Sequence, residues 1–186
     1  TGPVITAAHK GFDISNADCQ NCHAPHVGQK GKKGLLLPRS HKPFALGECA
    51  KCHQGTSITE FTAKGKDLCA TCHDKVAKIF TKPVIHPALE GGKECVGCHG
   101  PHVGFGKGLQ KKDGVQQCLI CHNTKEFTGK LQHPPAFEDC GNCHDPHSSD
   151  YKKLLSTPDI IELCTTCHED AKKTHYHRMG PGVTDP

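Results

Sequence analysis

The sequence contains few of the residues from which a protein core is usually built. Its 186 residues include no Trp, two Tyr, seven Phe and one Met. The hydrophobic fraction is 34%, and it falls to roughly 26% once the 14 Cys are set aside, well below the usual globular share. Gly and Pro are frequent, at 20 and 13 residues. A chain of this composition buries too little apolar surface to fold unless another group supplies the core.

Long apolar runs are also absent. The longest strictly aliphatic run is Leu35 to Leu37, whereas a membrane-spanning helix needs about 20 apolar residues. We therefore predict no membrane span. The sequence starts at Thr1 with neither Met nor an apolar leader, as we expect of a mature form whose signal peptide has been removed.

Cysteine and histidine are the residues in excess, and all 14 Cys belong to one pattern, Cys-x-x-Cys-His. With 16 His in the chain, a His after every pair would arise by chance with a probability on the order of 10⁻⁸, so the pattern predicts c-type haem attachment. The two thiols join the vinyl groups of one haem, and the His ligates its iron. The predicted attachment residues are Cys19, Cys22, Cys49, Cys52, Cys69, Cys72, Cys95, Cys98, Cys118, Cys121, Cys140, Cys143, Cys164 and Cys167. The predicted proximal ligands are His23, His53, His73, His99, His122, His144 and His168.

Three other uses of paired cysteines fit less well. Zinc ribbons do not require a His after each pair. A disulfide framework does not require the fixed spacing. Thioredoxin-like motifs occur once, beside a βαβ pattern. We therefore expect seven c-type haems as the cofactors.

The motifs repeat in pairs with a period of about 46 residues. Each unit consists of a His, a first CxxCH and a second CxxCH, and the units cover residues 41–73, 86–122 and 133–168. A half unit with one motif precedes them over about 9–37, and a tail follows over 174–186. Three first motifs continue into Pro-His, at His26, His102 and His147, whereas Thr56 stands at that position in unit 41–73. We predict a single haem-packed domain over 1–186.

The stretches CHAPHVGQKGKKGLLL, CHGPHVGFGKGLQ and CHDPHSSDYKKLL resemble the multihaem cytochromes with doubled CxxCH motifs. The resemblance covers about 9–168 and departs from the family pattern at the lone first motif and at Thr56. It implies a multihaem cytochrome c fold, mostly irregular coil with a few short α-helices and little or no β, organised around a stacked haem chain. It also implies export, because haem is attached to such motifs after export, and hence an extracellular or periplasmic location.

Nine His lie outside the motifs, and seven of them occupy repeated positions. A lone His is usually a surface residue, but the repetition favours ligation here. Seven candidates match seven vacant sixth iron positions, so we predict bis-His haems. A Pro-His histidine follows its own proximal His closely, so we expect it to serve a neighbouring haem. The predicted distal ligands are His9, His26, His41, His86, His102, His133 and His147.

His175 and His177 exceed this count and are interpreted as reserves or as ligands between subunits. In the second case His9 is donated to an adjacent molecule, or a C-terminal His replaces it, and the head-to-tail contact builds a filament. Met179, the one Met, is not assigned as a ligand.

Secondary structure should be sparse. We predict short helices from Asp67 to about Phe80, from Asp113 to about Asn123, and from Asp159 to about Lys173, the last with Pro158 in the first turn. Gly28 to Gly34 and Gly91-Gly92 are predicted loops.

The formal net charge of +4 omits the cofactors. Haem propionates and ferric irons change it to about −3 when oxidised and about −10 when reduced. We therefore expect no nucleic-acid partner. The lysine runs at 30–33, 111–112, 152–153 and 172–173 are interpreted as solvated faces, with propionate pairing or partner docking as the alternative.

One haem per about 27 residues brings haems into contact with one another, so the sequence predicts electron transfer and no catalytic residues. Bis-His ligation predicts low potentials. A reductase for nitrite or hydroxylamine would need an open iron, and nitrite enzymes often replace a motif His with Lys, which none of these motifs does. Among carriers, we favour a head-to-tail homo-oligomer resembling extracellular cytochrome nanowires over a soluble periplasmic shuttle. The expected partners are other redox proteins or extracellular acceptors.

Overall fold

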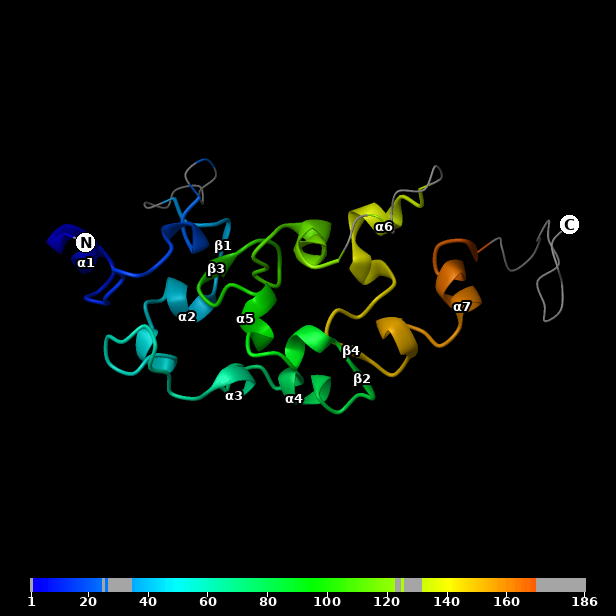
Figure 1. Cartoon of the computed structure of the whole chain (residues 1–186), viewed down its shortest axis with the longest axis horizontal. Helices are drawn as coiled ribbons and strands as arrows, with labels where there is room; N and C mark the ends of the chain where they lie inside the picture. The colour runs from blue at the N-terminus through cyan, green and yellow to red at the C-terminus, as the bar shows by residue number, and fades with distance from the viewer. Residues whose placement is uncertain (1, 25, 27–34, 123–124, 126–131, 170–186) are drawn as a thin grey trace, which may run out of the picture.

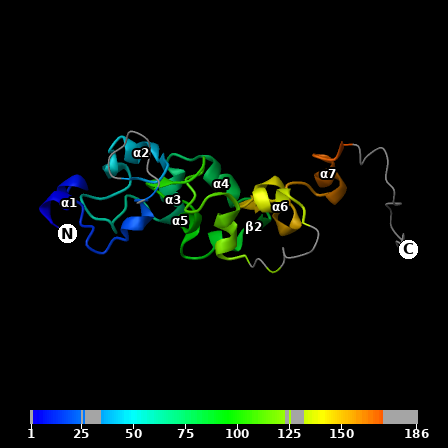
Figure 2. The same ribbon diagram turned by 90° about the horizontal axis from the view of Figure 1, so that it is seen from above.

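The protein is an elongated ribbon in which the chain advances along the long axis from one end to the other. The computed structural model describes residues 2–24, 26, 35–122, 125 and 132–169. Helix α1 (Pro3–Ala8) lies at one end and α7 (Ile160–Thr165) towards the other (Figure 1), and the molecule is narrow when it is turned by 90° (Figure 2). The accessible surface is 14424 Å², whereas a folded monomer of 20.1 kDa exposes about 8,700 Å². The polypeptide alone is therefore an open scaffold.

Most described residues are coil, as the sequence predicted, and the regular elements are short. The other α-helices are α2 (Lys42–Ala45), α3 (Gly65–Ala70), α4 (Lys75–Ile79), α5 (Glu94–Cys98) and α6 (Pro135–Glu138). The 3₁₀ turns are η1 (Cys19–Asn21), η2 (Cys49–Lys51), η3 (Pro87–Leu89), η4 (Gly114–Ile120), η6 (Cys140–Asn142) and η7 (Lys152–Leu154). The strands are β1 (Arg39–Ser40), β2 (Val84–Ile85), β3 (Val103–Gly104) and β4 (Ser148–Ser149). Helices this short are not stable in isolation, so their stability comes from contacts with other groups.

The predicted helices are shorter than expected. The helix predicted from Asp67 to Phe80 is two helices, α3 and α4, because the CxxCH turn at 69–73 interrupts it. The helix predicted from Asp159 ends at Thr165, and Pro158 precedes its N-cap instead of occupying its first turn. The stretch after Asp113 is the 3₁₀ helix η4 and not an α-helix. Positions 123 and 170–173 and the loop predicted at 28–34 lie outside the described residues, whereas Gly91-Gly92 is a loop as predicted.

Two small antiparallel β-pairs join consecutive repeat units. In the first, Arg39 pairs with Gly104 and Ser40 with Val103; in the second, Val84 pairs with Ser149 and Ile85 with Ser148. In each pair, the strand just before the leading His of one unit meets the strand just after the Pro-His of the next unit. The joints are tightly packed, since Val103 is 1% exposed, and Ser148 and Ser149 are each 2% exposed.

Large apolar side chains otherwise face open space. Among the described residues, Leu37 and Val103 are the buried hydrophobic ones. Val4, Leu46, Ile120 and Ile160 are all more than half exposed. The structure thus has the apolar surface of a core without polypeptide to cover it, which fits a scaffold built for large apolar groups. In the described part of the chain, every helix is too short or too polar to cross a membrane.

Candidate functional site

Each CxxCH motif forms a single helical turn. In all seven, the backbone N–H of the His donates to the carbonyl of the first Cys, over 2.8–3.0 Å. This bond places the two thiols and the imidazole of one motif around the same short turn. The turns begin in polar caps where Asp is available, as at Asp18 and Asp139, whose carboxylates accept the N–H two residues on.

The cysteines are free thiols at open positions. All 14 are unpaired, and none of them is fully buried. Free Cys is ordinarily one of the most deeply buried residue types. This exposure fits thiols that serve as attachment points for a group outside the polypeptide, and it does not fit a disulfide framework.

Six of the seven motif histidines face a second imidazole across a gap of nearly constant width. The ring centroids are 5.8–6.2 Å apart. Two imidazoles on opposite sides of one metal, each with a metal–nitrogen bond of about 2 Å and a ring radius of about 1.1 Å, place their centroids about 6.2 Å apart. Each gap therefore has the width that one iron needs. The pairs are His9–His23, His41–His73, His53–His102, His86–His122, His99–His147 and His133–His168.

The pairs follow two rules set by the repeat. The His that leads a unit faces the second motif of that unit, as His41 faces His73. The Pro-His histidine of a unit faces the first motif of the preceding unit, as His102 faces His53 and His147 faces His99. The β-joints enforce the second rule, because the N–H of His41 donates to the carbonyl of His102 over 2.7 Å.

The pair at the N-terminal end departs from these rules, because a different histidine takes the place of a missing Pro-His ligand. By the second rule, His23 would be faced by residue 56 of the following unit, which is Thr. His9 faces His23 instead, with centroids 6.1 Å apart. In the structure, His9 therefore lies opposite a motif His of its own chain.

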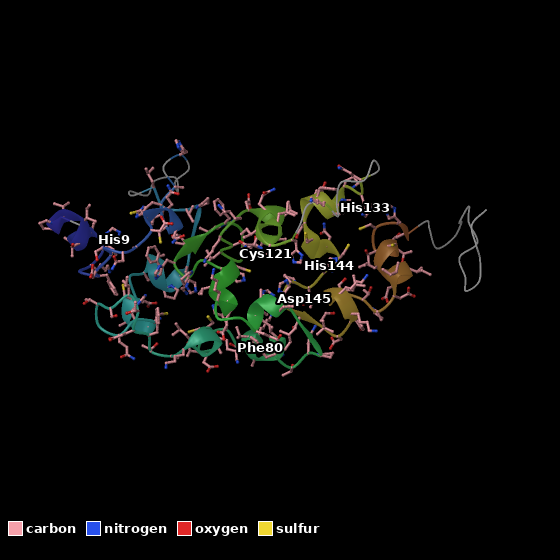
Figure 3. The ribbon with its side chains drawn as sticks, in the orientation of Figure 1. His9, Phe80, Cys121, His133, His144 and Asp145 are labelled. Carbon is pink, nitrogen blue, oxygen red and sulfur yellow. The ribbon has the colours of Figure 1, made fainter. Side chains whose placement is uncertain are left out.

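Two of the predicted ligands are not brought into a pair. No other imidazole lies opposite His144 among the residues that the structure describes, and His26 is exposed without a facing ring in the same part of the chain. Figure 3 shows His144 in the same half of the molecule as His133, far from His9. His175, His177 and Met179 lie outside the described residues.

Backbone carbonyls select the tautomer of several of these rings in the neutral form. Nδ1 lies 3.0 Å from the Ser57 carbonyl in His53 and 2.8 Å from the Lys153 carbonyl in His144. His99 makes the same contact with the carbonyl of Gly108. A carbonyl only accepts, so Nδ1 carries the proton and Nε2 keeps the lone pair that a metal needs.

Two leading histidines are held in the same way. Nδ1 of His9 donates to the Ile5 carbonyl over 2.8 Å, and Nδ1 of His41 donates to the Pro101 carbonyl over 2.9 Å. His86 differs, because its Nδ1 accepts the N–H of Ala88 over 3.1 Å. To present the lone pair of Nε2 to a metal, the His86 ring would carry its proton on Nδ1 and would lose this bond.

Burial and facing rings favour the neutral, metal-binding form of three candidate distal ligands. Burial lowers the pKa of His102, and the nearby His53 and His41 lower it further. Burial also lowers the pKa of His147, with a further contribution from His99 that Asp145 opposes. The pKa of His86 is lowered by burial and by His122.

Cysteines of successive motifs also approach one another. Burial raises the pKa of the Cys69 thiol to about 11, and the nearby Cys95 thiol contributes. The pKa of Cys118 is raised to about 11 in the same way, with Cys140 as the neighbour. The first approach is held by Glu94, whose carboxylate accepts the N–H of Lys66 over 2.7 Å at the start of α3. Groups attached to these neighbouring motifs would therefore lie close together.

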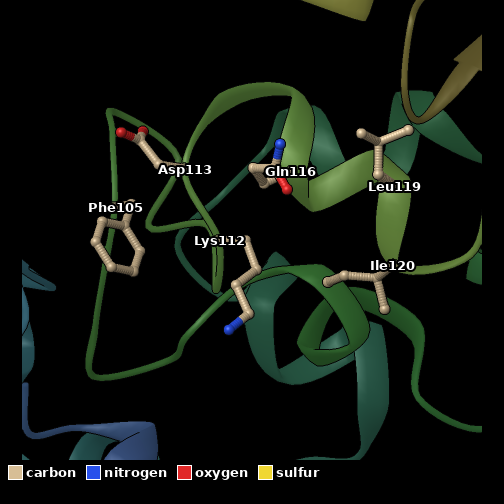
Figure 4. A pocket seen from close by; sticks show the side chains of 6 residues that line it. All are labelled: Phe105, Lys112, Asp113, Gln116, Leu119 and Ile120. Carbon is tan, nitrogen blue, oxygen red and sulfur yellow. The ribbon is translucent and has the colours of Figure 1, made fainter. Parts of the chain in front are cut away.

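An apolar hollow adjoins the fifth motif. Figure 4 shows its lining, in which Phe105, Leu119 and Ile120 provide apolar surface, and Lys112, Asp113 and Gln116 complete the wall. An apolar hollow beside an attachment turn fits one face of a porphyrin.

Sequence reasoning missed the aromatic rings that border the paired imidazoles. Phe12 and Phe61 lie 5.3 and 5.1 Å from the His53 ring, and Phe44 lies 5.1 Å from the His102 ring. The signal for Phe44 is its position three residues after a leading His, with Pro43 in the first turn of the short helix α2. These rings restrict the rotation of the imidazoles.

Comparison with known proteins agrees with this geometry. The family model described as the doubled CXXCH motif matches residues 41–78, 86–127 and 133–173. Paired CxxCH turns on a coil scaffold define the class of multihaem c-type cytochromes. The chain belongs to the doubled CXXCH motif family.

Three relatives are similar over parts of the chain. The multiheme cytochrome MtrA of Shewanella baltica is 29% identical over 178 residues, which cover 91% of this chain and 49% of the relative. The high-molecular-weight cytochrome c of Nitratidesulfovibrio vulgaris is 27% identical over 139 residues, 59% of this chain and 25% of the relative. The cytochrome c nitrite reductase subunit NrfH of the same organism is 24% identical over 100 residues, 43% of this chain and 63% of the relative. The chain thus spans less than two thirds of each of these relatives.

Proposed function

We propose that the protein conducts electrons through seven c-type haems, each held between two histidines. The observation that carries this proposal is the set of six facing imidazole pairs, with centroids 5.8–6.2 Å apart, each pair containing one motif His. The haem supplies the one-electron chemistry when it is bound. The chain's residues attach it, saturate its iron and set its distance from the next haem.

Contacts between successive motifs support a single file of haems in sequence order. Phe12, next to the first site, touches the His53 ring of the second. Cys52 lies near Cys69, and Cys69 lies near Cys95. Cys118 lies near both Cys98 and Cys140. In this proposal the whole chain forms one haem-packed domain, and the file of haems follows the long axis of the ribbon in Figure 1.

Irons that are bound by a histidine on both sides favour an electron carrier over a reductase. A facing imidazole occupies the position at which a substrate such as nitrite would bind. The similarity to NrfH keeps the reductase as the second candidate, since that relative is a nitrite reductase subunit. His144 is the motif position at which an open iron would have to lie, because no imidazole faces it among the described residues.

We further propose an extracellular or periplasmic location and head-to-tail assembly into a filament, with other redox proteins or extracellular acceptors as partners. Haem attachment after export supports the location. The elongated shape supports the filament, because it places the first and last repeat units at opposite ends of the molecule (Figure 1). A monomeric periplasmic shuttle is the alternative.

The test is haem stoichiometry and spin state in the purified holoprotein. Intact-mass measurement should give seven haem masses per chain, and EPR of the oxidised protein should show low-spin iron at the six paired sites at least. Fewer than seven attached haems would contradict the count. High-spin iron at several sites, together with nitrite reduction, would favour the reductase.

A further inference from the structure

Two of the paired sites are built alike and differ in one charge. They are the second site, between His53 and His102, and the fourth site, between His99 and His147. Their rings are stacked, with centroids 5.8 and 5.9 Å apart and interplanar angles of 25° and 15°. In both sites the motif His donates from Nδ1 to a backbone carbonyl. The two sites therefore present the same pair of ligands in different surroundings.

The difference is a carboxylate beside the distal ring of the fourth site. Oδ1 of Asp145 lies 3.7 Å from Nδ1 of His147, which is within ion-pair distance but too far for a hydrogen bond. The same oxygen accepts the backbone N–H of His147 over 2.9 Å and that of Ser148 over 3.3 Å. Ser148 belongs to a β-joint and is 2% exposed, so the fold holds this carboxylate next to the ring.

At the second site, a glycine stands where Asp145 stands at the fourth. It is Gly100, two residues before His102, and a Cβ at this position would collide with the backbone carbonyl of Val103. The backbone therefore excludes a carboxylate there. The second site is bordered by phenyl rings instead, and Phe44 lies 5.1 Å from the ring of His102. An apolar border disfavours the additional charge of an oxidised iron.

In the part of the chain that the structure describes, no Lys or Arg forms an ion pair with Asp145. Lys82 lines the same pocket as Asp145 but pairs with Asp150 over 3.4 Å. Among the ion pairs of the described residues, the contact of Asp145 with His147 is the one that includes a predicted ligand. The two side chains are 40% and 39% exposed, so water screens their interaction only in part.

We propose that Asp145 lowers the reduction potential of the fourth haem and makes this haem the low-potential step in the file. Oxidation adds one positive charge to the iron, and a carboxylate behind its distal ligand stabilises that charge. On reduction the iron takes one electron from a neighbouring haem, whose iron is oxidised by one electron, and no bond or proton moves. Asp145 acts through His147 and is therefore a positioning residue. The inference rests on the proposed haem chain and adds an order of potentials to it.

The fourth haem is the middle one in a file of seven, and Figure 3 shows Asp145 near the middle of the molecule. Electrons that enter the file occupy the haems on either side of the fourth one first. A low-potential haem at this place therefore divides the file into two halves. The second haem, with its phenyl border, should have a higher potential than the fourth.

The experiment compares the wild-type holoprotein with Asp145→Asn in a redox titration followed by haem absorbance. The amide keeps an oxygen that accepts the two backbone N–H groups but removes the charge. The lowest reduction step should move to higher potential, with a threefold to tenfold change in the ratio of reduced to oxidised haem, or about 28 to 59 mV. The other steps should stay in place, and EPR should show the same low-spin iron as in the wild type.

Asp159→Asn is the matched control, because Asp159 also accepts the N–H two residues on, over 2.7 Å, at the start of α7. It should leave the lowest step in place. Asp145→Glu retains the charge and should keep that step below its position in Asp145→Asn. His147→Met marks the fourth haem, because a Met ligand raises the reduction potential of its iron. The step that this variant moves should again be the lowest one.

Four results would overturn the inference. One is a lowest step that stays in place in Asp145→Asn. Another is an equal shift in Asp159→Asn or in Asp145→Glu, which would exclude a local effect of charge. A third is high-spin iron in Asp145→Asn, which would show that Asp145 only holds the ligand in place. The last is a His147→Met protein in which a step other than the lowest moves.

The haem chain itself is tested separately in the wild type. It fails if the wild-type protein carries too few haems or has high-spin iron at the paired sites. The inference about Asp145 fails when the wild type is fully loaded and low-spin but its lowest step does not respond to the charge at position 145.

Discussion

Removing the imidazole of His102 should open one iron and leave the rest of the chain unchanged. The rings of His102 and His53 are 5.8 Å apart, and an Ala side chain at position 102 cannot span that gap. His41 is close to His102 but faces His73, so it is not free to replace the lost ligand. We therefore expect His102→Ala to convert about one seventh of the iron, roughly 14%, from low-spin to high-spin.

The assay is EPR of the oxidised holoprotein, with spin quantified against total haem. The His102→Met variant adds a second readout, because a Met ligand raises the reduction potential of one haem. In a redox titration, one of the reduction steps should therefore move to a higher potential than the rest. Lys82→Ala is a suitable control, since it removes only the exposed ion pair with Asp150. The reasoning is refuted if His102→Ala stays fully low-spin, or if it opens two or more irons.

Three further predictions test other parts of the structure. His9→Ala should also open about one iron in seven but leave assembly intact, as EPR and light scattering can establish; disassembly would indicate that His9 is donated between molecules. Val103→Ala should lower the free energy of unfolding by about 2 kcal/mol in guanidinium titrations, because Val103 is 1% exposed at a β-joint; Val96→Ala, at a 47% exposed site, is the control, and equal effects would contradict the packing argument. Chain without haem should show no cooperative thermal transition in calorimetry, because its buried apolar residues are so few, and a sharp transition would show that the polypeptide has a core of its own.

The coil-rich fold could be predicted from composition and motif spacing, but the partners of the histidines could not. The sequence indicated that a Pro-His histidine serves a neighbouring haem. That His102 faces His53, 49 positions earlier, depends on the β-joint between Ser40 and Val103, and two-residue strands leave no recognisable pattern. Ligation by the predicted distal histidines stays a prediction, which the variants at His102 and His9 test at two of the sites.

Helix lengths were wrong for a related reason. The pattern from Asp67 to Phe80 is compatible with one helix, but the turn that ends at His73 breaks it. A motif that must hold two thiols and an imidazole around one haem overrides local helix propensity. The position of His9 opposite His23, by contrast, follows from the sequence once the pairing rule is known, because Thr56 leaves His23 without a Pro-His partner.

The most direct test of the central claim is a coulometric titration of the purified holoprotein, followed by haem absorbance. A chain of seven connected bis-His haems should take up seven electrons per 20.1 kDa polypeptide, all at potentials below those of His/Met cytochromes c. Uptake of fewer than seven electrons, or haems that stay oxidised while their neighbours are reduced, would contradict the account.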